Sequence, residues 1–336
     1  MPPDRTAAVV LGAGFSYVGG LPLTRDLFDI SAPLPQAQSK AAHESYETVR
    51  WAFARARASD GSLTAEGWLA QLYAERANPL QEMLFRTTWD NAVRYALARL
   101  VTLPRGSNAH YYYGIGTYHC HPVHQQFWER VEREFAVRYI VSLNYDILVE
   151  QALHDTPSDH RAAPRCRYGG FQHVQAVRKM RNVVTGDHEL MQLGDDFVLY
   201  KLHGSVNWAW EPHSPTLKIH HDVRAVFRAD NKYGVPAIVP PIPEKDMPPE
   251  FGQVWSEARK VLSDTPTWII CGYSLPDYDE ALRRLFGGIL SSRPTTRLIV
   301  IDPDSQAVAA RWEALANNCS LLPLQGLPDA LSKNWT

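Results

Sequence analysis

Polar residues follow several short apolar runs of this sequence, at the points where strands would end. Asn144 and Asp146 follow the run at 139–143, and His203 follows the run at 197–202. An amide can orient a water molecule or a hydroxyl group, and an imidazole, whose pKa in water lies near neutrality, can take up a proton. These residue types could therefore hold and activate a nucleophilic water. Asparagine and aspartate also cap helices, so Asn144 and Asp146 have a structural interpretation as well.

Two glycines separated by one residue follow the first apolar run, in the segment Gly12-Ala13-Gly14-Phe15-Ser16. Glycines at a strand end let the backbone turn sharply and bring its N–H groups close to a diphosphate. The pattern is not the full dinucleotide fingerprint, because Tyr17 stands where a third glycine belongs. A tight turn without a ligand would need the same glycines, so both interpretations stay open.

The apolar runs themselves predict a sheet. They are short and end at turn residues, as strands buried on both faces do; they are residues 7–11, 139–143, 197–202, 237–239, 267–271 and 297–301. Helical periodicity follows several runs, which predicts a Rossmann-like, doubly wound α/β fold with a mostly parallel sheet. Ligands of such sheets bind at the carboxyl ends of the strands. Gly272, Ser274 and Asp302 lie at such ends, and a carboxylate there is the usual partner of ribose hydroxyls.

The spacing of the runs predicts how the chain is divided. Well over a hundred residues separate the first two predicted strands, too many for one crossover, and apolar residues recur there at helical spacing. We therefore expect a large helical insertion at 25–135 and a Rossmann-like core made of 1–24 and 136–336. Residues 156–196, rich in Arg, Gly and His, are expected to form loops with short elements.

Composition excludes several classes of protein. The 34 Lys and Arg nearly balance the 36 Asp and Glu, giving a formal net charge of -2, so no overall field draws the protein onto nucleic acid or an acidic membrane. No apolar stretch is long enough to span a bilayer, and the first residues lack the apolar run of a signal peptide. We expect a cytoplasmic protein that binds neither membranes nor nucleic acid directly.

Metal binding is not expected. The four cysteines contain no C-x-x-C pair, which argues against a zinc ribbon and a disulfide framework; they are Cys120, Cys166, Cys271 and Cys319. The segment His119-Cys120-His121, with His124 close by, has no carboxylate or second cysteine to complete a ligand set.

Taken in order, these motifs resemble the NAD-binding and catalytic motifs of the sirtuin superfamily; they are Gly12-Ala13-Gly14-x-Ser16, Asn144-x-Asp146, His203-Gly204, Gly272-x-Ser274 and Asp302. Segments 142–146, 201–208 and 272–279 are most similar to the sirtuin-like NAD hydrolase domains of bacterial anti-phage defence systems. Sirtuin deacylases carry a four-cysteine zinc ribbon between the His-Gly and Gly-x-Ser motifs. This chain lacks it, which argues against peptide deacylation.

The resemblance implies a role for each matching residue in binding and cleaving NAD+ as a substrate. Asn144 would hold the nicotinamide ribose or a water, Asp146 would face the nicotinamide carboxamide, and His203 would be the general base. The remaining matches would bind the phosphates and the adenosine side; they are Gly12, Ala13, Gly14, Phe15, Ser16, Gly272, Ser274 and Asp302. Arg25 corresponds weakly to a functional sirtuin arginine, because Leu23 and Thr24 replace the Asp and Phe that precede it there.

The implied reaction is hydrolysis of NAD+ to ADP-ribose and nicotinamide. Nicotinamide leaves as a neutral base from a cationic pyridinium, so the site needs no general acid. It must stabilise an oxocarbenium-like ribose and deliver water to it, as in glycoside cleavage. Phe15 or Trp208 could add cation–π attraction to the pyridinium.

The resemblance also implies a biological role and a need for control. We expect an effector of anti-phage defence that works as a homo-oligomer or with a separately encoded activator or sensor protein, because no sensor domain is appended. Two other classes remain open. The protein could transfer ADP-ribose to a protein, in which case labelled NAD would leave its label on that protein. It could instead be an NAD-dependent deacylase, which would consume NAD only when an acyl-lysine is present. It could also be a non-catalytic sensor that binds NAD or ADP-ribose without releasing nicotinamide.

Overall fold

A computed structural model describes most of the chain. The described residues are 5–23, 26–29, 31, 40–75, 82–100, 121–153, 165–171, 174–179, 189–190, 194–210, 217–220, 235–240, 248–293, 296–315 and 319–335. Arg25, Tyr111, His119 and Cys120 lie outside these ranges.

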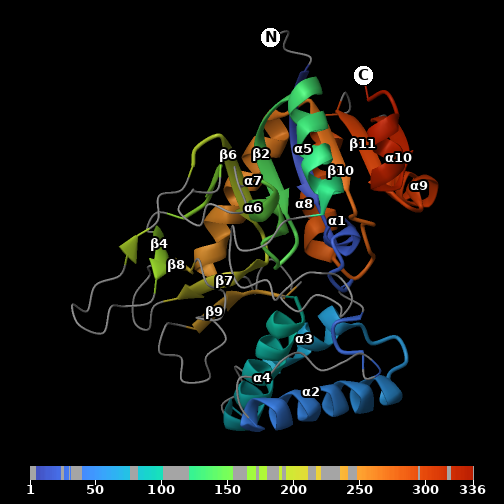
Figure 1. Ribbon diagram of the computed structural model, residues 1–336. Helices are drawn as coiled ribbons and strands as arrows, with labels where there is room; N and C mark the ends of the chain where they lie inside the picture. The colour runs from blue at the N-terminus through green and yellow to red at the C-terminus, as the bar shows by residue number, and fades with distance from the viewer. Residues whose placement is uncertain are drawn as a thin grey trace.

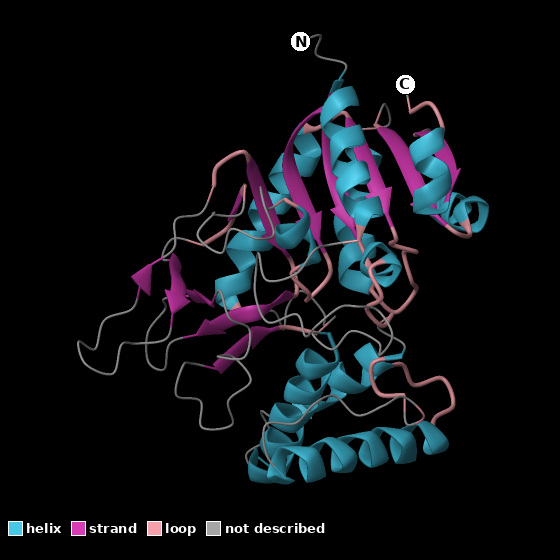
Figure 2. Ribbon diagram, in the orientation of Figure 1, coloured by secondary structure: helices cyan, strands magenta, loops and turns pink. Residues whose placement is uncertain are grey.

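A seven-stranded parallel sheet forms the centre of the molecule (Figure 2). Its strands are, in spatial order, β12 (Ser320–Gln325), β11 (Arg297–Asp302), β10 (Thr267–Cys271), β1 (Thr6–Leu11), β2 (Ala136–Ser142), β6 (Phe197–Lys201) and β3 (Cys166–Tyr168). The chain passes from β1 to β2 on one side and reaches β10 only later, on the other side. The order therefore reverses at β1, which confirms the predicted doubly wound, mostly parallel fold.

Helices cover both faces of this sheet, which explains why its central strands β1 and β10 are almost entirely apolar (Figure 1). One layer consists of α5 (Pro122–Glu134), α6 (Leu148–Ala152) and α10 (Gly326–Ser332). The opposite layer consists of α7 (Pro249–Asp264), α8 (Glu280–Ser292) and α9 (Ser305–Leu315). Asp279 begins α8 by accepting a hydrogen bond from the Leu282 N–H at 3.4 Å.

A second sheet of five strands lies beside the first. Its order is β5 (Glu189–Leu190), β4 (Val174–Lys179), β8 (Leu217–His220), β7 (Gly204–Trp210) and β9 (Val235–Ile238). The prediction that residues 237–239 belong to the parallel sheet is wrong, because β9 pairs antiparallel with β7. Gly204 has a φ of 85° and lets β7 turn away directly after β6, which carries β9 with it. An apolar run indicates a strand without indicating its partner.

Three helices of the expected insertion pack together beyond the carboxyl ends of the parallel strands (Figure 1). They are α2 (Lys40–Ser59), α3 (Ala65–Glu75) and α4 (Glu82–Leu100). Phe28 joins their aromatic core, with its ring centroid 5.1 Å from Trp68 and 5.5 Å from Tyr95. Helix α5 also falls within 25–135, but it packs on β2, α6 and α10. We therefore place α5 in the layer that covers the sheet.

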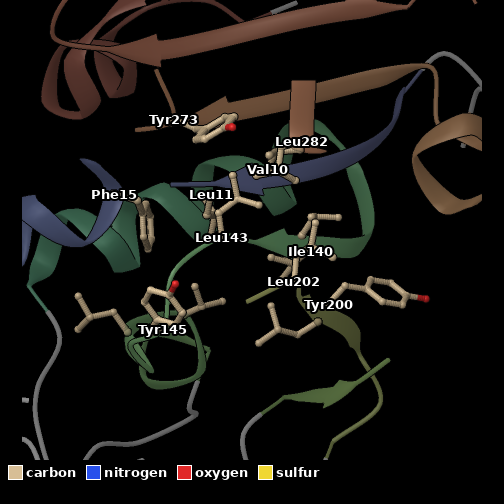
Figure 3. Close-up of a cluster of buried hydrophobic side chains, with 14 of the residues drawn as sticks. Val10, Leu11, Phe15, Ile140, Leu143, Tyr145, Tyr200, Leu202, Tyr273 and Leu282 are labelled. Atoms are coloured by element: carbon tan, nitrogen blue, oxygen red, sulfur yellow. The ribbon is translucent and has the colours of Figure 1, made fainter. Parts of the chain in front are cut away.

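Buried side chains from neighbouring strands meet directly beneath the strand ends (Figure 3). Val10 and Leu11 of β1 pack beside Ile140 of β2, with Leu143 and Leu202 just beyond their strands. This close packing holds the polar turns that follow these strands in fixed positions. Within the described ranges, the helices are too short or too polar to cross a bilayer.

Candidate functional site

The turns that follow β1 and β10 touch each other where the strand order reverses. The Gly12 N–H donates to the Cys271 carbonyl at 3.0 Å, and the Gly14 N–H donates to the Gly272 carbonyl at 2.9 Å. Gly272 has a φ of 67°, and a Cβ there would lie 2.2 Å from the Phe15 nitrogen. This close approach accounts for the glycines as turn residues. It also means that the N–H groups of Gly12 and Gly14, which were expected to face a phosphate, donate to backbone carbonyls instead.

A cavity of about 560 Å³ opens at these turns, within the size range of small-molecule sites. It lies in the crevice where ligands of doubly wound sheets bind. Its wall brings together most of the predicted site residues, from five separate segments; they are Gly12, Ala13, Gly14, Asn144, His203, Gly272, Ser274 and Asp302. Residues far apart in the sequence thus converge on one cavity.

Asn144 is almost completely buried, at 6% exposure. Its Nδ2 donates to the Gly12 carbonyl at 2.8 Å and to the Ser16 hydroxyl at 2.9 Å. Both amide hydrogens are therefore used to hold the glycine turn against the end of β2. The Oδ1 atom remains for a ligand, so Asn144 can only accept a hydrogen bond from it.

His203 lies between two aromatic rings at the end of β6. Its ring centroid is 6.1 Å from those of Tyr145 and Trp255. Burial lowers the pKa of the imidazole to about 4, although a hydrogen bond to the Val239 backbone raises it in part. The pKa of His203 is therefore well below that of imidazole in water, and the ring is neutral at physiological pH.

The Nδ1 atom of His203 has no hydrogen-bond partner among the described residues. A neutral imidazole keeps a lone pair on one of its two ring nitrogens, so the neutral His203 ring can accept one hydrogen bond or proton. An unpaired buried polar atom in a residue of the cavity wall is costly unless a ligand or a water molecule bonds to it.

Three predicted site residues are not part of the described cavity wall. Phe15 packs against His124 and Phe127, with ring centroids 4.5 and 5.4 Å apart, and Ser16 accepts from Asn144. Asp146 accepts from the Leu148 N–H at 2.9 Å, which shapes the start of α6. A contact of Asp146 with a carboxamide stays a prediction.

Trp208, the other aromatic residue considered for the site, lies in β7. It is fully buried and packs on Tyr168 and Phe171, with ring centroids 4.9 and 5.1 Å away. It is likewise outside the described cavity wall.

A buried ion pair supports the turn that carries Asn144. The Lys201 Nζ lies 3.1 Å from the Glu150 Oε1, and both side chains are fully buried. Lys201 also donates to the Asp146 carbonyl, and Tyr168 donates to Glu150 at 2.8 Å. Sequence reasoning missed this pair, although a lysine inside an apolar strand was a signal that it needed a buried partner.

Four carboxylates contribute to the described cavity wall, and sequence reasoning predicted only Asp302 among them. Asp279, after β10, is 4% exposed and accepts from the Tyr273 hydroxyl at 3.1 Å. Burial raises its pKa to about 6, and nearby Glu66 contributes to the increase. Burial also raises the pKa of Asp302, against the effect of the 2.9 Å bond it accepts from the Asp304 N–H. Glu66 enters the wall from α3 of the insertion.

Two of the histidines considered as metal ligands are described, and both have structural contacts. His121 accepts from the Val123 N–H at 3.3 Å and begins α5, and the His124 Nε2 lies 2.8 Å from the Phe15 carbonyl. The described part of the chain contains no group of three or more His, Cys, Asp or Glu side chains that could hold a metal ion. Burial raises the thiol pKa of Cys166 and Cys271, so both stay protonated.

Solved structures similar to this chain are Sir2 proteins. A Sir2 homologue in complex with NAD is 14% identical, with a TM-score of 0.46, over 98% of this chain and 89% of that chain. A Sir2 structure with an inhibitor, 2′-O-acetyl-ADP-ribose and a deacetylated peptide is 15% identical, with a TM-score of 0.42, over 96% of this chain and 90% of that one. No family model and no curated protein match the chain. Similarity at this level concerns the fold alone.

Proposed function

We propose that the protein is an NAD+ glycohydrolase, which cleaves NAD+ with water to ADP-ribose, nicotinamide and a proton. One observation carries the proposal: Asn144 and His203, far apart in the sequence, both line the cavity at the strand-order reversal. That crevice is where doubly wound sheets bind dinucleotides. The ordered motifs of the sequence support the same substrate.

The two side chains have complementary tasks in this reaction. The Asn144 Oδ1 can accept a hydrogen bond from the attacking water or from a ribose hydroxyl, because its amide hydrogens are held by the protein. The neutral His203 ring carries a lone pair on one nitrogen and can take the proton that this water releases. The protein holds both side chains in place before the substrate binds, so they need little rearrangement when the transition state forms.

The chemistry accommodates a base as weak as His203. The bond between the ribose C1′ and the pyridinium nitrogen breaks, and its electron pair neutralises the nicotinamide. The water oxygen bonds to C1′, and a water attached to an electron-poor carbon becomes strongly acidic. An imidazole whose pKa is about 4 is neutral above pH 5, so it is always available to accept that proton.

The rest of the dinucleotide would extend along the other turns of the cavity. Its diphosphate would lie against the turn after β1, where Ala13 begins helix α1 (Ala13–Val18) and is part of the wall. Among the described residues, the Ala13 N–H has no backbone acceptor outside that helix. The Asp302 carboxylate would bind the adenosine ribose, with Ser274 and Gly272 beside it.

The experiment is to incubate the purified protein with NAD+ and measure free nicotinamide by chromatography. His203→Ala and Asn144→Ala should each lower kcat by about 10² to 10⁴ fold, the range expected for a proton acceptor or a water-orienting group. His121→Ala and Asn334→Ala change the same residue types at exposed positions and should leave the rate unchanged.

Folding must be checked in each variant by circular dichroism and thermal unfolding. Full turnover in both cavity variants would refute the proposal. Binding of NAD+ by the native protein without nicotinamide release would instead identify a binding protein. Label from NAD+ left on a protein would identify a transferase.

The role in anti-phage defence and the control of the activity are part of the proposal and rest on the motif resemblance. An enzyme that empties a cell of NAD+ needs restraint, which assembly or an activator could supply. Mass photometry alongside the nicotinamide assay tests this idea. A monomer with full activity in the absence of any other protein would contradict it.

A further inference from the structure

Asn144 and His203 occupy equivalent places beyond two paired strands. Strands β2 and β6 are parallel, and Ser142 and Lys201 are the last residues of their register. Asn144 lies two residues after Ser142, and His203 lies two residues after Lys201. The register of the sheet therefore ends just before both proposed catalytic residues, so their relative position depends on contacts made beyond it.

Lys201 makes a contact that bridges the two segments at this point. Its ammonium group donates to the backbone carbonyl of Asp146, in the turn that carries Asn144, and lies 3.1 Å from the Glu150 Oε1 in helix α6. A hydrogen bond from a charged donor is roughly twice as strong as one between neutral groups. One side chain of β6 is therefore joined both to the Asn144 turn and to the helix that follows the turn.

Two weaker contacts join the same segments. The Val206 N–H and the Ser205 hydroxyl of β7 donate to the Tyr145 carbonyl at 2.7 and 3.2 Å. The turn would therefore stay attached to the segment after β6 without Lys201, but it would lose its one charged constraint among these contacts.

The ion pair is poorly suited to stabilise the fold by itself. Both side chains are fully buried, and the attraction between two charges inside a protein often fails to offset the free energy of removing them from water. The Glu150 Oε2 has no hydrogen-bond partner among the described residues, so the pair is also incompletely satisfied. Neutral residues of similar volume would fill the same space. The position that the pair fixes is therefore a better reason for its presence.

We propose that Lys201 is a positioning residue for NAD+ hydrolysis: paired with Glu150, it holds the turn that carries Asn144 in a fixed position relative to His203. It acts through the turn, because Lys201 and Glu150 are both outside the described cavity wall. A displacement of about 1 Å in a reacting arrangement can lower a rate by about 10² fold. This inference rests on the proposed function, because it assumes that Asn144 and His203 act on the same water.

The test replaces both members of the pair at once, by Lys201→Met with Glu150→Gln, so that no buried charge is left without a partner. The kcat for nicotinamide release should fall by about 10 to 100 fold. The affinity for carba-NAD+, a carbocyclic analogue that cannot be hydrolysed, should stay within about twofold in calorimetric titration, because the lost constraint matters mainly in the transition state. The circular dichroism spectrum should stay native.

A second comparison separates positioning from folding. If Lys201 acts through Asn144, the same double change should lower kcat by less than about twofold in the Asn144→Ala background, where no amide remains to be positioned. A loss of folded protein would instead lower the rate by the same factor in both backgrounds. Arg165→Met with Glu132→Gln is the matched control, because it removes a partly exposed ion pair with a separation of 3.0 Å, and it should leave kcat unchanged.

Native kcat in the double variant would overturn the inference and leave the proposed function standing. Weaker binding of carba-NAD+ by more than about twofold, or an equal loss of kcat in the Asn144→Ala background, would also overturn it. Failure of the native protein to release nicotinamide would refute the proposed function itself.

A second variant covers the case in which the double variant does not fold. Lys201→Gln with Glu150→Gln places two amides that can bond to each other, and the glutamine side chain ends one atom short of the lysine nitrogen. The same outcomes apply to it. Failure of both variants to fold would make the ion pair a requirement of the fold and would overturn the inference.

Discussion

Asn144 shows how a side chain can serve the fold and the site together. Its two amide hydrogens join the turn after β1 to the end of β2, through the Gly12 carbonyl and the Ser16 hydroxyl. Replacing Asn144 with aspartate would remove these donors and place a negative charge beside two acceptors. The two hydrogen bonds donated by the NH2 group thus require an amide at this position, while the amide oxygen can still accept a hydrogen bond from a ligand.

Asp279 is the residue whose ionisation the fold opposes most clearly. Its pKa of about 6 lies above the ordinary value of 3.8, so the folded state holds the proton more tightly than the unfolded state does. The free energy of unfolding therefore falls as pH rises from about 4 to about 6. Above pH 6 the carboxyl is ionised in the folded state, and the whole destabilisation caused by its burial is present. A shift of this size corresponds to about 3 kcal/mol.

Asp279→Asn should stabilise the protein at pH 8 by about 1 to 3 kcal/mol, because it removes a buried charge. The asparagine oxygen can still accept from the Leu282 N–H, and its NH2 group can donate to the Tyr273 hydroxyl, which can also act as an acceptor. The difference should shrink toward zero at pH 4, where the native carboxyl is protonated. Urea unfolding at both pH values measures it, with Asp277→Asn as a control at a side chain that is 98% exposed. A variant that is no more stable than the native protein at pH 8 would contradict the pKa assigned to Asp279.

At the scale of elements, the contact between the turns after β1 and β10 sets the shape of the crevice. Gly272 is the tightest point of that contact, because its φ of 67° disfavours any side chain and the Phe15 nitrogen occupies the space of a Cβ. The three atoms nearest to such a Cβ are backbone atoms of Gly14 and Phe15, which cannot move aside without displacing the turn.

Gly272→Ala should lower the free energy of unfolding by more than about 2 kcal/mol and weaken dinucleotide binding with it. Gly252→Ala is the matched control in α7, because a Cβ there meets no atom within 4 Å. In a helix this change should stabilise the protein by about 0.5 to 1 kcal/mol. Chemical denaturation of the two variants measures the contrast, and similar stabilities would show that the turns adapt to a side chain.

The elements differ in how far the sequence determines them. The runs that form β1 and β10 are apolar after an initial threonine, and this pattern predicted both the parallel sheet and the edge at which Asn144 and His203 lie. Glu66 could not be predicted, because its place in the wall depends on a contact 212 residues away. The second sheet was also missed. Strand β7 is buried almost throughout, and no alternation marks its faces.

At the scale of the whole molecule, the cavity joins parts that are otherwise separate. The parallel sheet supplies the glycine turns, Asn144, His203 and Asp302, and the insertion supplies Glu66. Figure 1 shows the insertion helices beyond the carboxyl ends of the strands, so a ligand in the cavity would lie between the two bodies. Binding should therefore stabilise both of them, because a ligand favours the state to which it binds.

Hydrogen exchange with carba-NAD+ tests this arrangement in the intact protein. Saturating ligand should slow exchange in the turns after β1, β2 and β10 and also in α3, whose first turn carries Glu66. Helix α7 lies in the layer behind the sheet and contributes no residue to the described wall, so its exchange should change only with global stability. Protection at the strand ends with α3 unchanged would place the ligand against the core alone. The insertion would then be a neighbour of the site without forming part of it.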